Sequence, residues 1–329
     1  MRETVLLDRF SRRLNYMRVS VTDRCNLRCA YCVPRNAIPR MSHHDILRYE
    51  EILRILQIGV SLGITKIRIT GGEPLVRKDL LPFMDKLTHI EGLSDIALTT
   101  NGLLLQDYLE PLRAAGIKRL NISLDTLRQD RYAQLTGQDG FDRVWKAIES
   151  ARKIGFSPIK INVVAMRGVN DDEFEDLASL TRSYPYHVRF IEYMPMGNTR
   201  LAHDPYISND QVRRSVERRA TLAPVTPGGQ DGPAQRFRYP GAPGEVGFIS
   251  PRSHHFCERC NRLRLTAAGK LRPCLLSNRE FDLITPLRAG ATDAQLAAVI
   301  LEGVRHKPMA HGLAGSDGHI NARMSSIGG

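Results

Sequence analysis

The sequence predicts an α/β fold: a barrel or partial barrel of about six β/α units, followed by a smaller C-terminal α+β part. Three observations support this prediction. Up to about residue 193, short segments of alternating polarity are separated by amphipathic segments of helical period. The alternating segments carry polar residues that a sheet covered on both faces would exclude. From about residue 205 the pattern changes, and residues 223–245 are rich in proline and glycine. We therefore expect one domain over residues 1–222 and a second over residues 223–329.

The β/α units can be placed from the period of the hydrophobic residues. Alternation predicts strands at residues 18–22, 66–70, 95–100, 119–125, 159–165 and 187–193. Between them, a 3.6-residue period predicts helices at 50–62 and 141–154, and Gly155 is expected to end the second of these. Asn170 is expected to cap a further helix, with Glu173 at its third position. Successive units of this kind form a parallel sheet through right-handed crossovers.

The polar residues in the strands distinguish a barrel from a sheet buried under helices. They include Lys66, Arg68, Asn121, Ser123, Asp125, Lys160, Asn162 and Arg189. A buried polar group without a partner costs a few kcal/mol, so one face of the sheet is expected to line a wet, ligand-filled lumen. In β/α barrels the ligand site lies at the C-terminal ends of the strands.

The chain is basic, with 47 Lys and Arg against 35 Asp and Glu and a net charge of +12. This balance favours an anionic partner or reflects a basic solvated surface. The cations are scattered, and Arg68, Lys160 and Arg189 lie within apolar segments, which favours a cationic pocket over a nucleic-acid stripe. No apolar run approaches the ~20 residues of a membrane span. The N-terminus, with Glu3 and Asp8, lacks a signal peptide, so we expect a cytoplasmic protein without membrane contact.

All six cysteines fall into two groups. The first, Cys25, Cys29 and Cys32, follows the first predicted strand. Clustered cysteines in a cytosolic enzyme bind metal more often than they form disulfides. Structural zinc prefers four ligands in a closed shell, and no fourth ligand follows closely here. Three thiolates suit a [4Fe–4S] cluster that leaves one iron open to chelation by a substrate or cofactor.

The second group is Cys257, Cys260 and Cys274, beside predicted strands at 245–249 and 262–266. With His254 and His255 nearby, its spacing fits a Cys3His zinc site as well as it fits an iron–sulfur cluster. The spacing alone leaves both interpretations open.

Several motifs together indicate a family. The sequence RVSVTDRCNLRCAYC at 18–32, followed by GGEP at 71–74, resembles the radical S-adenosylmethionine (SAM) superfamily. The sequence CERCNRLR at 257–264, with Cys274 and the terminal Gly328-Gly329 pair, resembles more narrowly the MoaA-type GTP 3′,8-cyclases of molybdenum cofactor biosynthesis. The resemblance extends over nearly the whole chain from about residue 13, apart from the proline- and glycine-rich segment.

The resemblance implies an incomplete (βα)6 barrel and a C-terminal domain that carries a second [4Fe–4S] cluster. The first triad would hold a cluster that binds SAM, and the second triad a cluster that binds the guanine of GTP. The residues implied to contact SAM are Tyr31, Gly72, Ser123 and Met194. Those implied to contact GTP are Arg18, Arg68, Thr99, Lys160, Arg262, Arg264, Gly328 and Gly329.

The residue types suit these implied roles. Glycines such as Gly71 and Gly72 allow close backbone approach at a strand end. Arginine and lysine suit a triphosphate, and Arg262 and Arg264 alternate on a predicted strand, so their side chains share a face. Two glycines in series at the C-terminus could enter a crowded site, although chain ends are usually frayed.

The implied reaction is radical chemistry. Reductive cleavage of SAM would give a 5′-deoxyadenosyl radical that abstracts the ribose 3′ hydrogen of GTP. Attack of C3′ on C8 would then give 3′,8-cyclo-7,8-dihydro-GTP, with no side chain acting as a general base. The implied partners are GTP, an electron donor protein and a downstream enzyme that forms cyclic pyranopterin, with the protein a monomer or homodimer.

Two other classes remain open. A peptide-modifying radical enzyme typically carries more C-terminal cysteines than the three present here. An iron–sulfur or zinc nucleic-acid-binding regulator would need aromatic residues within a basic segment, whereas aromatic residues make up 6% of the chain and do not cluster. We therefore expect no nucleic-acid partner.

Overall fold

A single curved sheet organises the molecule. The computed structural model describes residues 5–32, 41–196, 201, 203–226, 228, 232–311, 320 and 324–327. Within these residues, twelve strands pair in the order β12-β11-β10-β1-β2-β3-β4-β5-β6-β9-β8-β7. The predicted α/β class is therefore correct, and the sheet is larger than the six predicted barrel strands.

Six parallel strands in chain order form the central part of the sheet. They are β1 (Tyr16–Ser20), β2 (Lys66–Thr70), β3 (Asp95–Thr100), β4 (Arg119–Ser123), β5 (Ile159–Ala165) and β6 (Tyr186–Glu192). The predictions at 66–70, 95–100 and 159–165 match the observed bounds. The first and last strands begin one or two residues earlier than predicted, and β4 ends two residues earlier.

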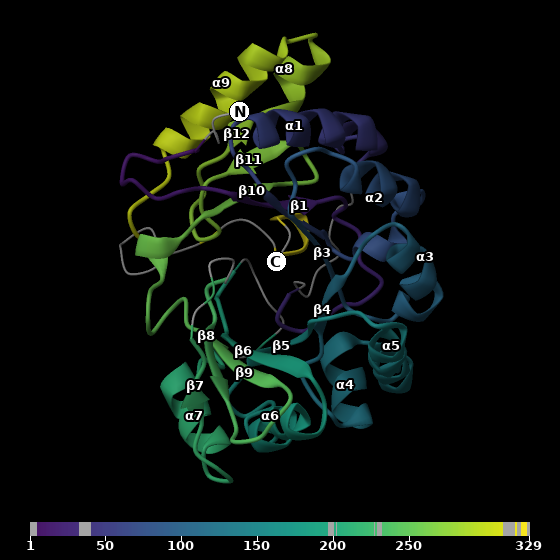
Figure 1. The fold of residues 1–329 in the computed structure, drawn as a ribbon, viewed down its shortest axis with the longest axis vertical. Helices are drawn as coiled ribbons and strands as arrows, with labels where there is room; N and C mark the ends of the chain where they lie inside the picture. The colour runs from purple at the N-terminus through teal and green to yellow at the C-terminus, as the bar shows by residue number, and fades with distance from the viewer. Residues whose placement is uncertain are drawn as a thin grey trace.

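Helices cover the outer side of these strands (Figure 1). They are α1 (Tyr49–Ser61), α2 (Leu80–Thr88), α3 (Leu109–Ala114), α4 (Gln129–Thr136), α5 (Phe141–Ile154) and α6 (Phe174–Ser183). Gly155 ends α5 in the left-handed conformation, with φ of 92°, as predicted. None of the helices in the described part of the chain has the length and apolar character needed to cross a bilayer.

The predicted cap of α6 is wrong. The helix begins one residue after Glu173, and Asn170 lies outside it. The Asn170 amide instead donates to the carbonyl oxygens of Asp125 at 2.7 Å and Val164 at 2.9 Å. The Glu173 carboxylate accepts a hydrogen bond from the Thr126 hydroxyl at 2.6 Å. Both side chains therefore hold loops at the ends of β4 and β5, a long-range role that the capping pattern does not reveal.

The C-terminal part of the chain extends both edges of the sheet. Next to β6 lie β9 (Glu245–Ile249), β8 (Gln235–Arg238) and β7 (Ala223–Pro224), and next to β1 lie β10 (Arg262–Leu265), β11 (Lys270–Arg272) and β12 (Phe281–Asp282). Both β9 and β10 run parallel to their neighbours in the barrel. The segment predicted to be loop-rich, 223–245, thus contributes β7, β8 and the start of β9.

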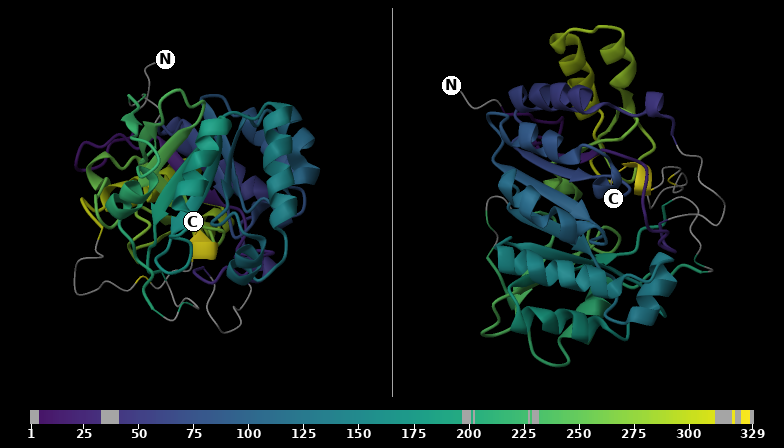
Figure 2. Two further views of the ribbon diagram at one scale, coloured as in Figure 1. Left: turned by 90° about the horizontal axis from the view of Figure 1, so that it is seen from below. Right: turned by 90° about the vertical axis from the view of Figure 1, so that its right-hand side faces the viewer.

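The remaining helices are α7 (Asn209–Val216), α8 (Ile284–Arg288), α9 (Asp293–Arg305) and α10 (Met324–Ile327). Figure 2 shows α8 and α9 beyond α1 at one end of the molecule. The contact includes an ion pair between Arg288 and Glu51 at 2.8 Å. The division into domains at residues 222 and 223 stays a prediction.

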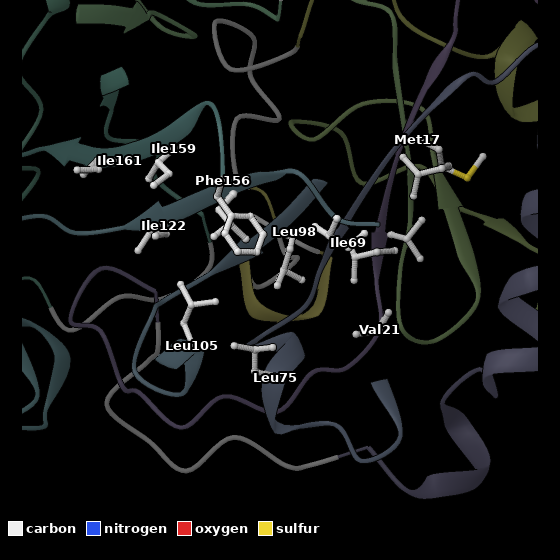
Figure 3. Close-up of a cluster of buried hydrophobic side chains, with 14 of the residues drawn as sticks. Met17, Val21, Ile69, Leu75, Leu98, Leu105, Ile122, Phe156, Ile159 and Ile161 are labelled. Atoms are coloured by element: carbon white, nitrogen blue, oxygen red, sulfur yellow. The ribbon is translucent and has the colours of Figure 1, made fainter. Parts of the chain in front are cut away.

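A continuous hydrophobic core lies between the sheet and its helices (Figure 3). Ile69, Leu98, Ile122 and Ile161 are fully buried on successive strands. Burying each such side chain stabilises the fold by roughly 1.5–3 kcal/mol. Because side chains alternate along a strand, the outward position of these residues leaves the polar residues on the inner face.

Candidate active site

The inner face of the sheet carries a row of arginines. In the strand register, Arg18 on β1 lies between Arg264 on β10 and Arg68 on β2. Residues in register on parallel strands share a face, so the three guanidinium groups project to the same side. Arg264 is only 4% exposed. The resemblance implies that all three contact GTP, and the register brings them together.

Polar groups on the other half of the inner face are hydrogen-bonded across three strands. Arg189 on β6 donates to the Oδ1 atoms of Asn162 on β5 at 3.0 Å and Asn121 on β4 at 2.8 Å. Lys66 and Asp95 pair at 2.6 Å nearer the N-terminal ends of their strands. The predicted polar face is therefore built from ordered contacts between neighbouring strands.

This concentration of positive charge is buried. Desolvation, with repulsion from Arg189 and other cations, lowers the pKa of Lys160 to about 6. Desolvation likewise lowers the pKa of Arg18 to about 10 and of Arg189 to about 9. The Tyr16 hydroxyl, in the same cluster, is buried and makes no hydrogen bond to the described residues. Buried charges are stable when they are paired, so the cluster suits a ligand with several negative charges.

The first cysteine triad lies on the loop that follows β1. Two hydrogen bonds fix this loop to the loop after β2: from Gly72 N to Thr22 O at 2.7 Å, and from Glu73 N to Arg24 O at 2.8 Å. A Cβ added at Gly72 would lie 2.3 Å from the Arg24 carbonyl oxygen, so only glycine fits. The glycine pair therefore packs against the cysteine loop.

A cavity opens beside the first triad. The three cysteines line it together with the four residues implied to contact SAM: Tyr31, Gly72, Ser123 and Met194. Cys25 Sγ accepts a hydrogen bond from Leu27 N at 3.4 Å and lies 3.8 Å from Asn101 Nδ2. The structure thus brings seven predicted residues from four loops and strands to one place.

Acidic groups also line or support this cavity. Asp125 accepts hydrogen bonds from the Tyr31 hydroxyl at 2.7 Å and from Val164 N at 2.8 Å, and its burial raises its pKa to about 6. Burial raises the pKa of Glu73 to about 7. In the sequence, Asp125 is a polar residue at the end of a predicted strand, and the resemblance implies no contact for it. The signal in the sequence for a role in the site was the position of Asp125 just after β4, where ligand sites of β/α barrels lie.

The second triad lines a second cavity. Cys257 lies in a short 3-10 helix (Cys257–Arg259), Cys260 precedes β10, and Cys274 follows β11. Three of the residues implied to contact GTP, Arg18, Arg262 and Arg264, line the same cavity. Both cavities are lined by Ile191 and Met194 at the end of β6, so the two sites adjoin.

The other predicted GTP contacts are distributed around these cavities. Thr99 lines the first cavity, and its hydroxyl is buried without a hydrogen-bond partner among the described residues. Arg68 and Lys160 line neither cavity and lie in the cationic cluster of the inner face. Gly328 and Gly329 lie outside the described residues.

Similarity to known proteins agrees with this geometry. Residues 19–181 match the model of the Radical SAM superfamily, and residues 186–313 match that of Molybdenum Cofactor Synthesis C. The protein called GTP 3′,8-cyclase from Moorella thermoacetica is 47% identical over 98% of this chain and 99% of its own length. The protein of the same name from Alkaliphilus metalliredigens is 48% identical, with 98% and 99% covered. The chain belongs to the GTP 3′,8-cyclase family.

Solved structures bear out the fold of this family member. The crystal structure of Streptococcus suis SuiB has a TM-score of 0.62 and 16% identity, covering 91% of this chain and 68% of that chain. The same protein bound to S-adenosylmethionine has a TM-score of 0.58 and 15% identity, covering 89% and 68%. The predicted radical SAM partial barrel is confirmed.

Family membership implies SAM and [4Fe–4S] clusters as cofactors, and the cysteines fit them. A [4Fe–4S] cluster is ligated at separate irons, so its thiolates do not converge on one point. Across the described residues, no three Cys, His, Asp or Glu side chains converge as a single metal ion requires. His254 bonds to Asp210 at 2.9 Å, and His255 bonds to the Pro251 carbonyl at 3.0 Å. Family membership therefore favours the iron–sulfur interpretation of the second triad over the zinc one.

Proposed function

We propose that this protein is a GTP 3′,8-cyclase that converts GTP to 3′,8-cyclo-7,8-dihydro-GTP, the first step of molybdenum cofactor biosynthesis. One observation carries the proposal: two cysteine-lined cavities adjoin at Ile191 and Met194, and a row of arginines lies beside the second. This arrangement suits a cofactor and a polyanionic substrate held side by side, which close-range hydrogen abstraction requires.

The residues around the first cavity would hold the cofactor. Cys25, Cys29 and Cys32 would bind a [4Fe–4S] cluster, and Tyr31, Gly72, Ser123 and Met194 would contact SAM. When bound, the cluster and SAM supply the radical that removes the ribose 3′ hydrogen of GTP. The protein orients both ligands and excludes water from the reacting atoms, and no side chain needs to accept a proton.

The cations would hold the nucleotide. Arg18, Arg68 and Arg264 are side by side, so they can form several charge-assisted hydrogen bonds to one triphosphate. Lys160, Arg262 and Thr99 would add further contacts. Cys257, Cys260 and Cys274 would hold a second [4Fe–4S] cluster, whose open iron would bind the guanine.

The C-terminal segment would complete the site. Met324 of α10 lines the first cavity, and Ile327 is buried in a cluster with Met196 and Leu276, against which Cys274 packs. These contacts hold the chain within the site one residue before Gly328. Gly328 and Gly329, which lie outside the described residues, would contact GTP, as the resemblance implies.

The partners follow from the reaction. An electron donor protein would reduce the clusters, and a downstream enzyme that forms cyclic pyranopterin would consume the product. We expect the protein to act in the cytoplasm as a monomer or homodimer. We expect neither a nucleic acid nor a membrane as a partner.

A peptide substrate, the main alternative from the sequence, has less support. The likeness to SuiB, at 16% identity, concerns the fold alone. A peptide backbone would not require the buried row of arginines on the inner face.

The test is anaerobic reconstitution followed by an iron count and an assay of SAM cleavage with GTP, with ATP and without nucleotide. Two cubane clusters correspond to about eight irons per chain. Only GTP should give a cyclised product by mass spectrometry. A count near four irons with one zinc would refute the second cluster, and product formation without preference for GTP would refute the substrate.

A further inference from the structure

Lys307 is a buried lysine next to the second triad. It follows α9 and is 2% exposed. Its ammonium donates to the carbonyl oxygens of Pro273 at 2.7 Å and Arg262 at 2.8 Å, and lies 3.5 Å from Cys260 Sγ. A lysine ammonium has three donor hydrogens, and these three acceptors use all of them.

The three acceptors belong to the segments that carry the second triad. Pro273 directly precedes Cys274, and Arg262 lies two residues after Cys260. One side chain thus joins the start of β10 to the end of β11. Close packing of α9 makes this possible: a Cβ added at Gly303 would lie 2.7 Å from Leu271 Cδ2, so a larger residue there would force the leucine side chain to shift.

Arg12 makes a matching contact to the remaining cysteine. It is 7% exposed and donates to the carbonyl oxygens of Cys257 at 2.7 Å and Pro308 at 2.7 Å. Asp8 holds its guanidinium at 2.6 Å. The arginine therefore ties the Cys257 segment to the residue that follows Lys307.

The charge of Lys307 is balanced differently from that of Arg12. Asp8 pairs with Arg12, whereas Lys307 contacts the Cys260 sulfur and forms no ion pair with a carboxylate among the described residues. A buried ammonium is costly unless an anion compensates it. Thiolates that ligate a cluster would provide that compensation, and a hydrogen bond to a ligating sulfur stabilises the more negative, reduced state.

We propose that Lys307 is a positioning residue of the second cluster: it fastens the segments of Cys260 and Cys274 to α9 and raises the reduction potential of the cluster through its bond to Cys260 Sγ. This inference rests on the proposed role of the second triad. It concerns the stability and potential of that cluster, and it leaves the first cluster unchanged.

The test compares Lys307→Met with Lys270→Met in full-length protein reconstituted anaerobically. Lys270 pairs with Asp282 at 2.9 Å, with the two side chains 33% and 40% exposed, and it does not line the cavity of the second triad, so it is the control lysine. Iron is counted, and the second cluster, recognised by the change of its spectrum on addition of GTP, is titrated by electron paramagnetic resonance.

We expect Lys307→Met to shift the reduction equilibrium of the second cluster about tenfold toward the oxidised form, which is 59 mV for one electron. Loss of the second cluster alone, with SAM cleavage retained, also supports the positioning role. Wild-type iron content and potential in Lys307→Met would overturn the proposal. If that variant does not fold, Lys307→Gln keeps two N–H donors without the charge, and a wild-type potential there would overturn the electrostatic role. A wild-type protein with only four irons would instead refute the second cluster itself.

Discussion

The two cysteine triads are built in opposite ways. The first lies on one loop after β1, fixed by backbone hydrogen bonds to the loop after β2. The second is assembled from three segments, which two buried cations, Arg12 and Lys307, hold together. A local motif thus makes one site, and long-range contacts make the other.

The surroundings of the triads also differ in charge. Asp125 and Glu73 lie near the first triad, and both are buried. Arg18, Arg262 and Arg264 surround the second. The sulfonium and amino groups of SAM are positive, and the triphosphate of GTP is negative. The charges therefore suit a cationic ligand in the first cavity and a polyanion in the second, as the proposed function requires.

The largest expected effect is on SAM cleavage, which should depend on the first triad more than on the second. Cys25→Ala should abolish SAM cleavage, because the first cluster loses a ligand. Cys274→Ala should spare part of the SAM cleavage that is uncoupled from GTP, while stopping GTP turnover. Chromatographic assay of 5′-deoxyadenosine and of the cyclised product measures both. Equal loss of SAM cleavage in the two variants would remove the functional distinction.

A second test concerns the arginine row. Arg264→Ala removes a charged hydrogen bond worth roughly 1.5–3 kcal/mol, so GTP affinity should fall about ten- to a hundredfold. SAM affinity should change little. Arg305→Ala, which removes an exposed pair with Glu302, is the control. Equal loss of affinity for both ligands would mean that Arg264 has a structural role.

A third test uses the pKa of Lys160, which lies at about 6 in the free protein. Above that pH the amine is neutral, and binding of a triphosphate favours its protonation, so GTP binding takes up a proton. GTP affinity should therefore fall as pH rises, by at most about tenfold per pH unit between pH 7 and 8. Calorimetry in buffers of different ionisation enthalpy measures the proton uptake. The same pH slope in Lys160→Met would contradict this assignment.

The smallest expected effect concerns the cavity beside the first triad, which Tyr31 lines. Tyr31→Phe removes the hydrogen bond to Asp125, worth about 1 kcal/mol, so SAM affinity should fall about fivefold. GTP affinity should not change. Tyr239→Phe is the control, because it also removes a hydroxyl hydrogen bond, to the Val216 carbonyl oxygen at 2.9 Å, and Tyr239 lines neither cavity. A larger effect on GTP than on SAM would reverse the assignment of the two cavities.

Features that depend on the order of neighbouring residues could be predicted from the sequence. Alternation located β2, β3 and β5, and the spacing of Cys25, Cys29 and Cys32 indicated the first cluster. It also identified polar strand residues that the register brings to one face.

Contacts between distant segments could not be predicted in this way. Arg12 and Lys307 look like ordinary surface cations in the sequence, yet they contact the second triad. Asn170 and Glu173 fit a capping pattern but bond to other loops. No local signal indicated that β9 and β10 would pair with opposite edges of the sheet.

The pairing of β9 and β10 with opposite edges has a consequence for biosynthesis. Until residues 245–265 leave the ribosome, β1 and β6 lack their outer partners and expose unpaired backbone groups. At synthesis rates of about 5–20 residues per second, this interval after β6 lasts on the order of ten seconds. The loop of the first triad is complete long before the last cysteine of the second is synthesised. The nascent chain is therefore a sheet with two open edges that is most prone to aggregation just before residues 245–265 are made, and its two metal sites become available in a fixed order.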